Sequence, residues 1–194
     1  MESCRRLVKD KDFIVLDTET TGLKNDDEII QLAVLEPRTM KPLIDTRVKP
    51  TKSIAKEATA VHGLTNHDVL DAPTFDKLYP ELETIFNRSS QVVIYNAAYD
   101  IRMLSQSRKP YGLPPFSIET DPSRVTCAME IFSSYVGDWN GRKGDFQWQK
   151  LPLAQHRPIQ DCISTLNVLR RMAVGEESIF IADMLCKCGH LKGL

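Results

Sequence analysis

The sequence lacks any apolar run long enough to cross a bilayer, and it has almost no net charge. A membrane-spanning helix needs about 20 apolar residues in a row, so we expect no membrane partner. The 194 residues include 25 Lys and Arg against 26 Asp and Glu, which gives a net charge of -1. This balance argues against a protein that coats nucleic acid through a general basic field, but it permits an enzyme that holds a few nucleotides locally.

Cysteine is scarce, and its number is odd. Scattered, unpaired cysteines are typical of reduced thiols, and the polar start of the chain lacks the apolar core of a signal peptide, so we expect a cytoplasmic protein. Cys186, Cys188 and His190 cluster near the end of the chain, but a closed zinc site needs four ligands, so free thiols are favoured there. The cysteines are Cys4, Cys127, Cys162, Cys186 and Cys188.

What is present suits one globular domain. With 42% hydrophobic and 26% charged residues, a chain of this length can bury a substantial core. No repeat, low-complexity tract or long linker divides it. We therefore expect a single domain over residues 1–194, with its functional core at about 12–172 and a helix and short tail at 176–194.

Apolar runs between turn residues predict the strands, and helical periodicity predicts the helices. A capping pattern marks a helix start at Thr65 and Asp68, and Pro80 is expected to begin or kink the helix that follows. The polar segment 137–149, with three glycines and two tryptophans, is predicted to be a surface loop. The expected strands are 12–17, 28–36, 43–48, 91–95 and 125–127, and the expected helices lie near 78–86, 98–106, 128–135, 159–172 and 176–186.

The order of these segments predicts the fold class. The first three strands follow one another too closely for parallel crossovers, so we expect an antiparallel meander. The later strands alternate with helices, which is typical of parallel pairing. The sequence therefore predicts an α/β fold with a mixed five-stranded sheet, three strands antiparallel and then two parallel, flanked by helices.

Asp17 and Glu19 follow the first apolar run of the chain. Residues two apart on a strand point to the same face, so these carboxylates should lie side by side at the end of a buried strand. They repel each other there, and a divalent metal ion is the simplest reason to place them so. Because a lone D-x-E pair is more often solvent-exposed, this interpretation depends on acids further along the chain.

Two further acids and a histidine occur in suggestive places. Asp100 follows a predicted buried strand, and strand ends in α/β sheets are common ligand sites. Asp161 lies early in a predicted helix whose first turn suits Pro158, and His156 lies on the loop before it. Each alone would be an ordinary surface residue. The offset across the helix start can, however, bring His156 and Asp161 toward one cleft.

The ordered set resembles the three motifs of the DEDDh (DnaQ-like) 3′–5′ exonucleases. These motifs are Asp17-x-Glu19, Asn96-x-x-x-Asp100 and His156-x-x-x-x-Asp161, and the residues from Thr18 to Leu23 match the first motif one by one. The segment 60–65 (Ala-Val-His-Gly-Leu-Thr) resembles the linking motif of these enzymes. The resemblance covers about residues 12–172 and is nearest to the exonuclease X-like and replicase epsilon-subunit members.

Two positions depart from the pattern of that family. Pro158 stands where alanine is common, and Tyr99 stands where phenylalanine is more usual. Neither departure removes a catalytic group. The polar segment 137–149 matches no motif of the family.

The resemblance implies an RNase H-like fold and metal-dependent hydrolysis of phosphodiester bonds from a 3′ end, releasing nucleoside 5′-monophosphates. Asp17, Glu19, Asp100 and Asp161 would hold two divalent ions, Mg²⁺ or Mn²⁺, that activate a water and stabilise the departing oxygen. His156 would be the general base, because imidazole accepts protons near neutral pH.

Residues around the motifs are expected to handle the substrate. Glycine lets a backbone approach a nucleotide closely, and leucine can wedge against bases, although core packing explains the leucines equally well. Lys49, Lys52 and Arg102 are candidates for phosphate contacts, and Trp139 and Trp148 for base stacking. The predicted substrate-binding residues are Thr18, Thr20, Gly22, Leu23, His62, Leu64, Asn96 and Tyr99, with Asn96 favoured as a brace for the loop that holds Asp100.

The motifs do not separate DNA from RNA, because that choice depends on contacts to the 2′-hydroxyl. The residues after His156 and Asp161 favour a DNase of the exonuclease X type that acts on single strands or 3′ overhangs. The alternative is an exoribonuclease of the RNase T or oligoribonuclease type. Further alternatives are a proofreading or docking module of a polymerase or repair complex and an RNase H-like endonuclease. The expected partners include a second copy of the chain, as a homodimer.

Overall fold

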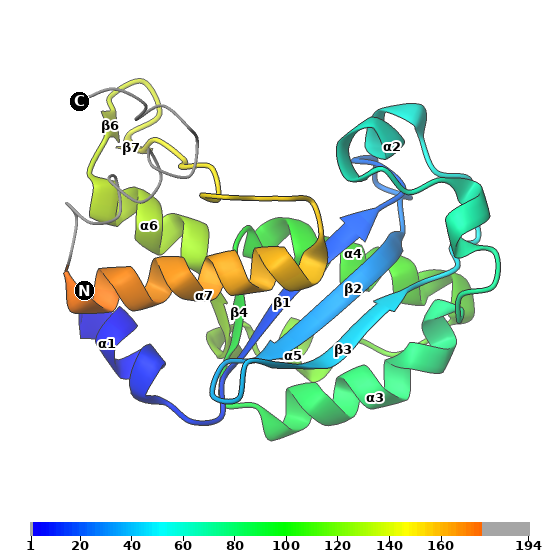
Figure 1. Ribbon diagram of the computed structural model, residues 1–194, viewed down its shortest axis with the longest axis horizontal. Helices are drawn as coiled ribbons and strands as arrows, with labels where there is room; N and C mark the ends of the chain where they lie inside the picture. Colours follow the sequence, from blue (N-terminus) through cyan, green and yellow to red (C-terminus); the bar gives the residue numbers. More distant parts are fainter. Residues whose placement is uncertain (1, 176–194) are drawn as a thin grey trace, which may run out of the picture.

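The computed structural model describes residues 2–175, and its centre is a five-stranded sheet in the order β3-β2-β1-β4-β5 (Figure 1). β1 pairs antiparallel with β2, and β2 with β3, whereas β4 is parallel to both β1 and β5. The predicted mixed α/β sheet is therefore confirmed. The strands are β1 (Ile14–Thr20), β2 (Ile29–Glu36), β3 (Lys41–Arg47), β4 (Val92–Ile94) and β5 (Val125–Cys127).

Alternation along β1 divides the core into two layers. Ile14 and Leu16 face one layer, which is covered by three helices, α3 (Phe75–Arg88), α4 (Ala97–Arg108) and α5 (Ser117–Thr120). Phe13 and Val15 face the other, covered by α1 (Glu2–Lys9), α6 (Ala128–Val136) and α7 (Pro158–Val174). Figure 1 shows α7 lying across the sheet, where it contacts β1 and β2. Burial on both faces explains why β1 reads as a nearly continuous apolar run.

Several boundaries differ from those expected. β1 continues to Thr20 because β2 pairs with it that far, so the strand runs past its predicted end at Asp17 and includes Glu19. α3 begins at Phe75, so Pro80 lies in its second turn and neither begins the helix nor ends it. The capping box of Thr65 and Asp68 is present, but it opens the short 3₁₀ helix η1 (Asn66–Val69).

The helices α1, α2 (Lys56–His62) and α5 and one hairpin were not predicted. α1 is polar on its outer face and reaches the core through Cys4 and Leu7, a pattern too short to stand out in the sequence. α2 buries no residue completely, so it has no apolar face to detect. The predicted loop 137–149 contains a two-stranded hairpin, β6 (Trp139–Asn140) and β7 (Asp145–Phe146).

Three further predictions concern the cysteines, the end of the chain and the lack of a membrane span. Within the described residues, Cys4, Cys127 and Cys162 form no disulfide. The predicted helix at 176–186 and the cluster of Cys186, Cys188 and His190 lie outside the part that is described. Between residues 2 and 175, no helix has the length and apolar character that a bilayer crossing requires.

Phe116 ties together the layer under α3. Its ring meets Phe75 and Phe86 edge-on, with centroids 6.2 and 5.2 Å away, and stacks on Tyr79 at 4.5 Å. Because Phe116 is fully buried, Phe116→Ala should lower the free energy of unfolding by about 3–5 kcal/mol in urea denaturation. The control Val136→Ala, at an exposed position, should change it by about 0.5 kcal/mol or less. Equal losses in both variants would contradict this role.

Candidate active site

Four acids meet where β1 and β4 end. Asp17 and Glu19 point from β1 to the face that α7 covers, and Asp100 and Asp161 lie in the first turns of α4 and α7. β4 runs parallel to β1 in register with it, so the helix that follows β4 starts beside Asp17. The sheet thus gathers residues that are up to 144 positions apart in sequence, from Asp17 to Asp161.

These acids open into one cleft of about 650 Å³. All four line it, together with His156, so the structure brings together every residue predicted to be catalytic. Tyr95, Asn96 and Tyr99 line it from the end of β4 and the start of α4. The remaining lining residues are Thr18, Leu23, Met129, Trp148, Gln149, Lys150, Leu151 and Ala154.

His156 lies on the loop before α7, as predicted, and has a left-handed backbone with φ of 52°. Histidine is one of the few non-glycine residue types found repeatedly in that region. The backbone N–H of Gln155 donates to Asp161 Oδ1 at 2.8 Å, so Asp161 holds the loop that presents the imidazole. Pro158 occupies the first position of α7, where a missing N–H costs nothing.

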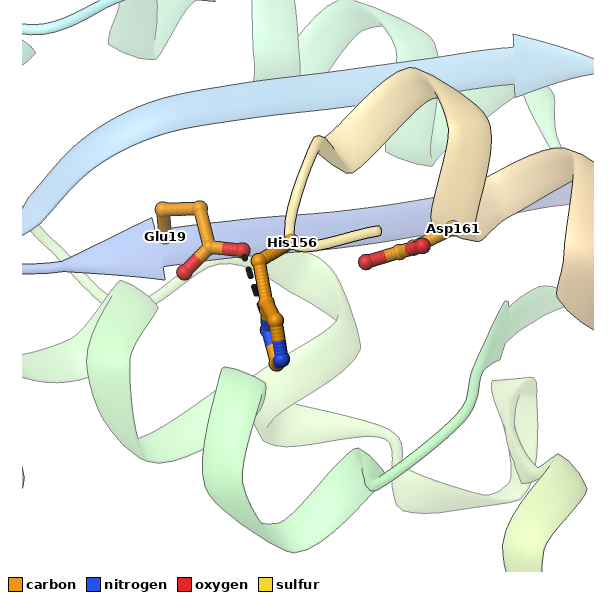
Figure 2. A group of neighbouring side chains, drawn as sticks. All are labelled: Glu19, His156 and Asp161. Atoms are coloured by element: carbon orange, nitrogen blue, oxygen red, sulfur yellow. Dashed lines mark ion pairs between the residues drawn. The ribbon is translucent and has the colours of Figure 1, made fainter. Parts of the chain in front are cut away.

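The imidazole lies between two of the carboxylates, as Figure 2 shows for Glu19 and Asp161. Nδ1 of His156 is 3.8 Å from Oε1 of Glu19. Ligand atoms of Glu19, His156 and Asp161 all lie within 4.8 Å of one another. This spacing suits either a shared metal ion or a base beside metal-binding carboxylates.

Burial and mutual repulsion make this cluster reluctant to ionise. Burial, followed by the charges of Asp161 and Asp100, raises the pKa of Glu19 to about 7. Burial also raises the pKa of Asp100 to about 7, against a hydrogen bond from Thr18 that lowers it. Asp17, which keeps partial access to the cleft, has its pKa raised well above the usual range by burial and then by its three acidic neighbours.

A cation is the simplest way to relieve this repulsion. The donor set of Asp17, Glu19, Asp100 and Asp161 consists of carboxylate oxygens, the ligands that hard divalent ions prefer. The raised pKa values of Asp17, Glu19 and Asp100 indicate that the surrounding side chains do not compensate the negative charge of the ionised carboxylates. The residues present therefore fit a divalent metal site.

The hydroxyl groups of Thr18 and Thr20 form hydrogen bonds that hold residues of the site in place. Thr18 is buried and donates from Oγ1 to Asp100 Oδ1 at 2.7 Å, which joins β1 to α4. Thr20 is also buried; its Oγ1 lies 2.6 Å from the Tyr99 hydroxyl and 2.9 Å from the carbonyl oxygen of Gly22. Thr18 and Thr20 thus position neighbouring groups, and their predicted contact with substrate stays a prediction.

Gly22 has a structural requirement of its own. A Cβ at this position would lie 2.6 Å from Asp27 Oδ2. Asp27 accepts hydrogen bonds from the backbone N–H of Lys24 at 2.6 Å and the hydroxyl of Thr21 at 2.8 Å, and it pairs with Lys52 at 3.0 Å. The glycine therefore lets Asp27 close the loop after β1, and Lys52 serves that loop rather than the cleft.

The other predicted substrate-handling residues divide into two groups. Leu23, 77% exposed, and Asn96 line the cleft. The Asn96 side chain makes no capping hydrogen bond, but its carbonyl oxygen accepts from the Asp100 N–H at 3.3 Å. His62 and Leu64 lie beside the site, where Nδ1 of His62 accepts from the Leu64 N–H at 3.0 Å. Burial, with the charge of His156 adding to it, lowers the pKa of His62.

Part of the wall of the cleft is formed by residues that belong to none of the motifs. Trp148 and Lys150 line it from the segment that follows the hairpin, whereas Trp139 does not, and neither do Lys49 and Arg102. The tryptophans in a polar, glycine-rich segment were the only sequence signal for this wall. Their position relative to the acids depends on the path of the chain between α6 and α7.

Replacing Asp100 by Asn tests the electrostatic cost of the cluster in metal-free protein. The folded state holds a proton on Asp100 up to about pH 7, whereas the unfolded state loses it near pH 4. The folded state therefore binds more protons between these values, and the contribution of Asp100 to stability falls as the pH rises through that window.

Asp100→Asn should match the wild-type free energy of unfolding at about pH 4 and exceed it by roughly 1–3 kcal/mol at pH 8 in EDTA, since the Asn oxygen can still accept from Thr18. Urea denaturation across this pH range measures the difference. Glu81→Gln, at an exposed position on α3, should show no such trend. A variant less stable than wild type at pH 8 would contradict the predicted sign.

Comparison with known proteins agrees with this geometry. The model of the RNase_T family, described as exonuclease, matches residues 14–169. An uncharacterized exonuclease, CP81 of Escherichia phage 186, is 36% identical over 181 residues, covering 84% of this chain and 89% of the phage protein. The DNA polymerase III epsilon subunit of Escherichia coli K12 is 35% identical over 97 residues, and this match covers 45% of the chain and 40% of the subunit.

Solved structures share the fold at lower identity. Exonuclease X in complex with 5′-overhanging duplex DNA superposes with a TM-score of 0.53 at 24% identity, over 89% of this chain and 98% of that protein. The zinc-bound E. coli ExoI–ssDNA complex gives a TM-score of 0.67 at 13% identity, over 90% of this chain and 43% of ExoI. The family match spans most of the sequence and carries the motif acids, so the chain belongs to the RNase_T exonuclease family, with the motifs of its DEDDh (DnaQ-like) 3′–5′ exonucleases.

Proposed function

We propose that this protein is a DNA exonuclease that removes nucleotides from a 3′ end with two divalent metal ions, Mg²⁺ or Mn²⁺, and with His156 as the general base. The observation that carries the proposal is the convergence of Asp17, Glu19, Asp100, Asp161 and His156 on one cleft. Acids whose pKa values are raised by burial and by one another, and which line a cleft, are typical of functional sites.

The four carboxylates would hold the ions, which when bound neutralise charge on the phosphate, lower the pKa of an attacking water and stabilise the departing oxygen. Asp17 interacts electrostatically with the other three acids and would be one of the residues that hold the ions. Thr18 would keep Asp100 in its ligand geometry through their hydrogen bond.

His156 would accept the proton of the attacking water. Its side chain is half exposed to the cleft, 3.8 Å from Glu19, and it projects from a loop that Asp161 holds in place. A hard ion favours the oxygen ligands over imidazole, which leaves the nitrogen free for proton transfer. The left-handed backbone at this residue turns the imidazole back toward β1.

The cleft would hold the last nucleotide between its walls. Leu23 stands exposed on one side, and Asn96 and Tyr99 lie near the start of α4. His62, Leu64 and Gly22, which lie outside the lining, would act by shaping the loops after β1 and α2. Thr20 would act through its hydrogen bond to Tyr99.

DNA is proposed as the substrate because of what the similar proteins bind or serve. Two of the solved structures of this fold hold DNA, and several relatives are DNA polymerase III subunits. A second candidate role, proofreading within a polymerase complex, is favoured by the epsilon-subunit likeness. A pull-down that recovers a replicase subunit would support the second role.

One gel tests the proposed activity. Oligonucleotides of DNA and RNA, labelled at the 5′ end, should be shortened stepwise from the 3′ end in Mg²⁺ or Mn²⁺, with DNA cut faster, and should stay intact in EDTA. Asp17→Ala is the control for contaminating nucleases and should be inactive. Faster cutting of RNA would reverse the choice of substrate, and cutting of a circular single strand would replace the exonuclease by an endonuclease.

The role of His156 has its own test. His156→Ala should lower kcat by about 10²–10⁴-fold, because general-base catalysis typically contributes that much. Mn²⁺ binding, measured by calorimetry, should persist because the carboxylates remain. Added imidazole should restore part of the rate in His156→Ala but not in Asp17→Ala. Turnover near that of wild type would rule out His156 as the base.

A further inference from the structure

The segment 137–150 forms one wall of the cleft, although it matches no motif of the family. It leaves α6, makes the β6–β7 hairpin and returns toward the start of α7 (Figure 1). Trp148 is 61% exposed and still lines the same cleft as Glu19 and His156. A large apolar ring held open beside an active site is a candidate for contact with a ligand.

The residue next to Trp148 is firmly anchored. The Tyr95 hydroxyl donates to the carbonyl oxygen of Gln149 at 2.8 Å, and the Gln149 N–H donates to Ser133 Oγ at 3.1 Å. Tyr95 ends β4, the strand that also leads to Asp100, and Ser133 lies on α6. The backbone beside Trp148 is therefore fixed relative to the catalytic acids, although the indole itself is not buried.

The hairpin is also stiffened from within. Trp139 packs edge-on against Phe146, with centroids 5.3 Å apart and an interplanar angle of 83°. The Asn140 amide donates to the side-chain oxygen of Gln147 at 2.9 Å. Trp139 thus has a packing role in the hairpin, whereas Trp148 lines the cleft.

Positive charge accompanies the exposed ring. The Lys143 ammonium lies 5.4 Å from the centroid of Trp148, and Lys150 lines the cleft. Within residues 2–175, neither lysine forms an ion pair with a carboxylate. An exposed aromatic ring with lysines nearby suits a single strand, in which bases and phosphates alternate.

We propose that segment 137–150 is a single-strand grip in which Trp148 stacks on a nucleobase near the 3′ end and Lys143 and Lys150 contact the flanking phosphates. This inference rests on the proposed function, because it assumes that the cleft takes a nucleic-acid end. The lysines also offset the negative floor of the cleft, which would otherwise repel the phosphates. Stacking reads no base identity, so the grip predicts affinity without sequence preference.

Fluorescence isolates the proposed contact. The chain contains only two tryptophans, so Trp139→Phe leaves Trp148 as the single emitter and Trp148→Phe leaves Trp139. Titration with oligothymidylate in EDTA, where the strand is not consumed, should quench the emission of Trp148. The emission of Trp139 should change little, and an abasic oligonucleotide of equal charge should quench neither.

Rates of hydrolysis on two substrates then distinguish a loss of strand binding from a loss of catalysis. Trp148→Ala should lower kcat/KM on a single-stranded oligonucleotide by roughly 10–100-fold, mainly through KM, as expected for the loss of one base stack. The same variant should lose much less of its rate on the p-nitrophenyl ester of thymidine 5′-monophosphate, because that substrate has no further nucleotide. Trp148→Phe should keep most of the activity, and Trp148→Leu should not.

The outcomes are distinguishable. Wild-type kcat/KM on the oligonucleotide in Trp148→Ala, or an unchanged Trp148 emission on titration, overturns the grip and leaves the exonuclease intact. Equal losses on the oligonucleotide and on the nitrophenyl ester also overturn it, because they point to a damaged active site. If the wild-type protein hydrolyses neither substrate, the proposed function fails, while the quenching still decides whether Trp148 meets a base.

Discussion

The site depends on holding four carboxylates together against their mutual repulsion. Burial and neighbouring charge raise the pKa of Glu19 and of Asp100 to about 7, so the metal-free protein carries a local instability at the edge of its sheet. The two apolar layers on either side of β1 supply the stability that offsets it. The cost in stability agrees with the proposed function, in which bound cations would offset the repulsion.

Hydrogen bonds from a backbone N–H and from a hydroxyl group keep two of the acids in place without neutralising them. Asp161 is the clearest case, because one of its oxygens accepts from the Gln155 N–H and so positions the loop of His156. On the other side, Thr18 links Asp100 to β1. The same side chains that would bind metal therefore also set the geometry of the base, and a change in one should be felt by the others.

The floor and the walls of the cleft differ in origin. The floor consists of motif residues from β1, α4 and α7, whose positions follow from the parallel pairing of β1 with β4. The walls come from the loop after β1, with Leu23, and from segment 137–150, with Trp148. The loop after β1 is closed by Asp27, which needs Gly22 beside it, whereas segment 137–150 is held by Tyr95 and Ser133. The chemistry and the grip on substrate can therefore vary separately.

Local patterns in the sequence determined the strands and whether they pair antiparallel or parallel, because alternation, turn residues and connection lengths are short-range properties. The resemblance of the motifs singled out Asp17, Glu19, Asp100, His156 and Asp161. Local patterns did not determine α1 and α2, whose buried faces are too small to read. Nor did they show that Thr18 and Thr20 hydrogen-bond to Asp100 and Tyr99, or that the position of Asp27 requires glycine at residue 22. Only the tertiary structure decided which of two similar tryptophans faces the cleft, because that depends on contacts of Gln149 with β4 and α6, which are distant in sequence.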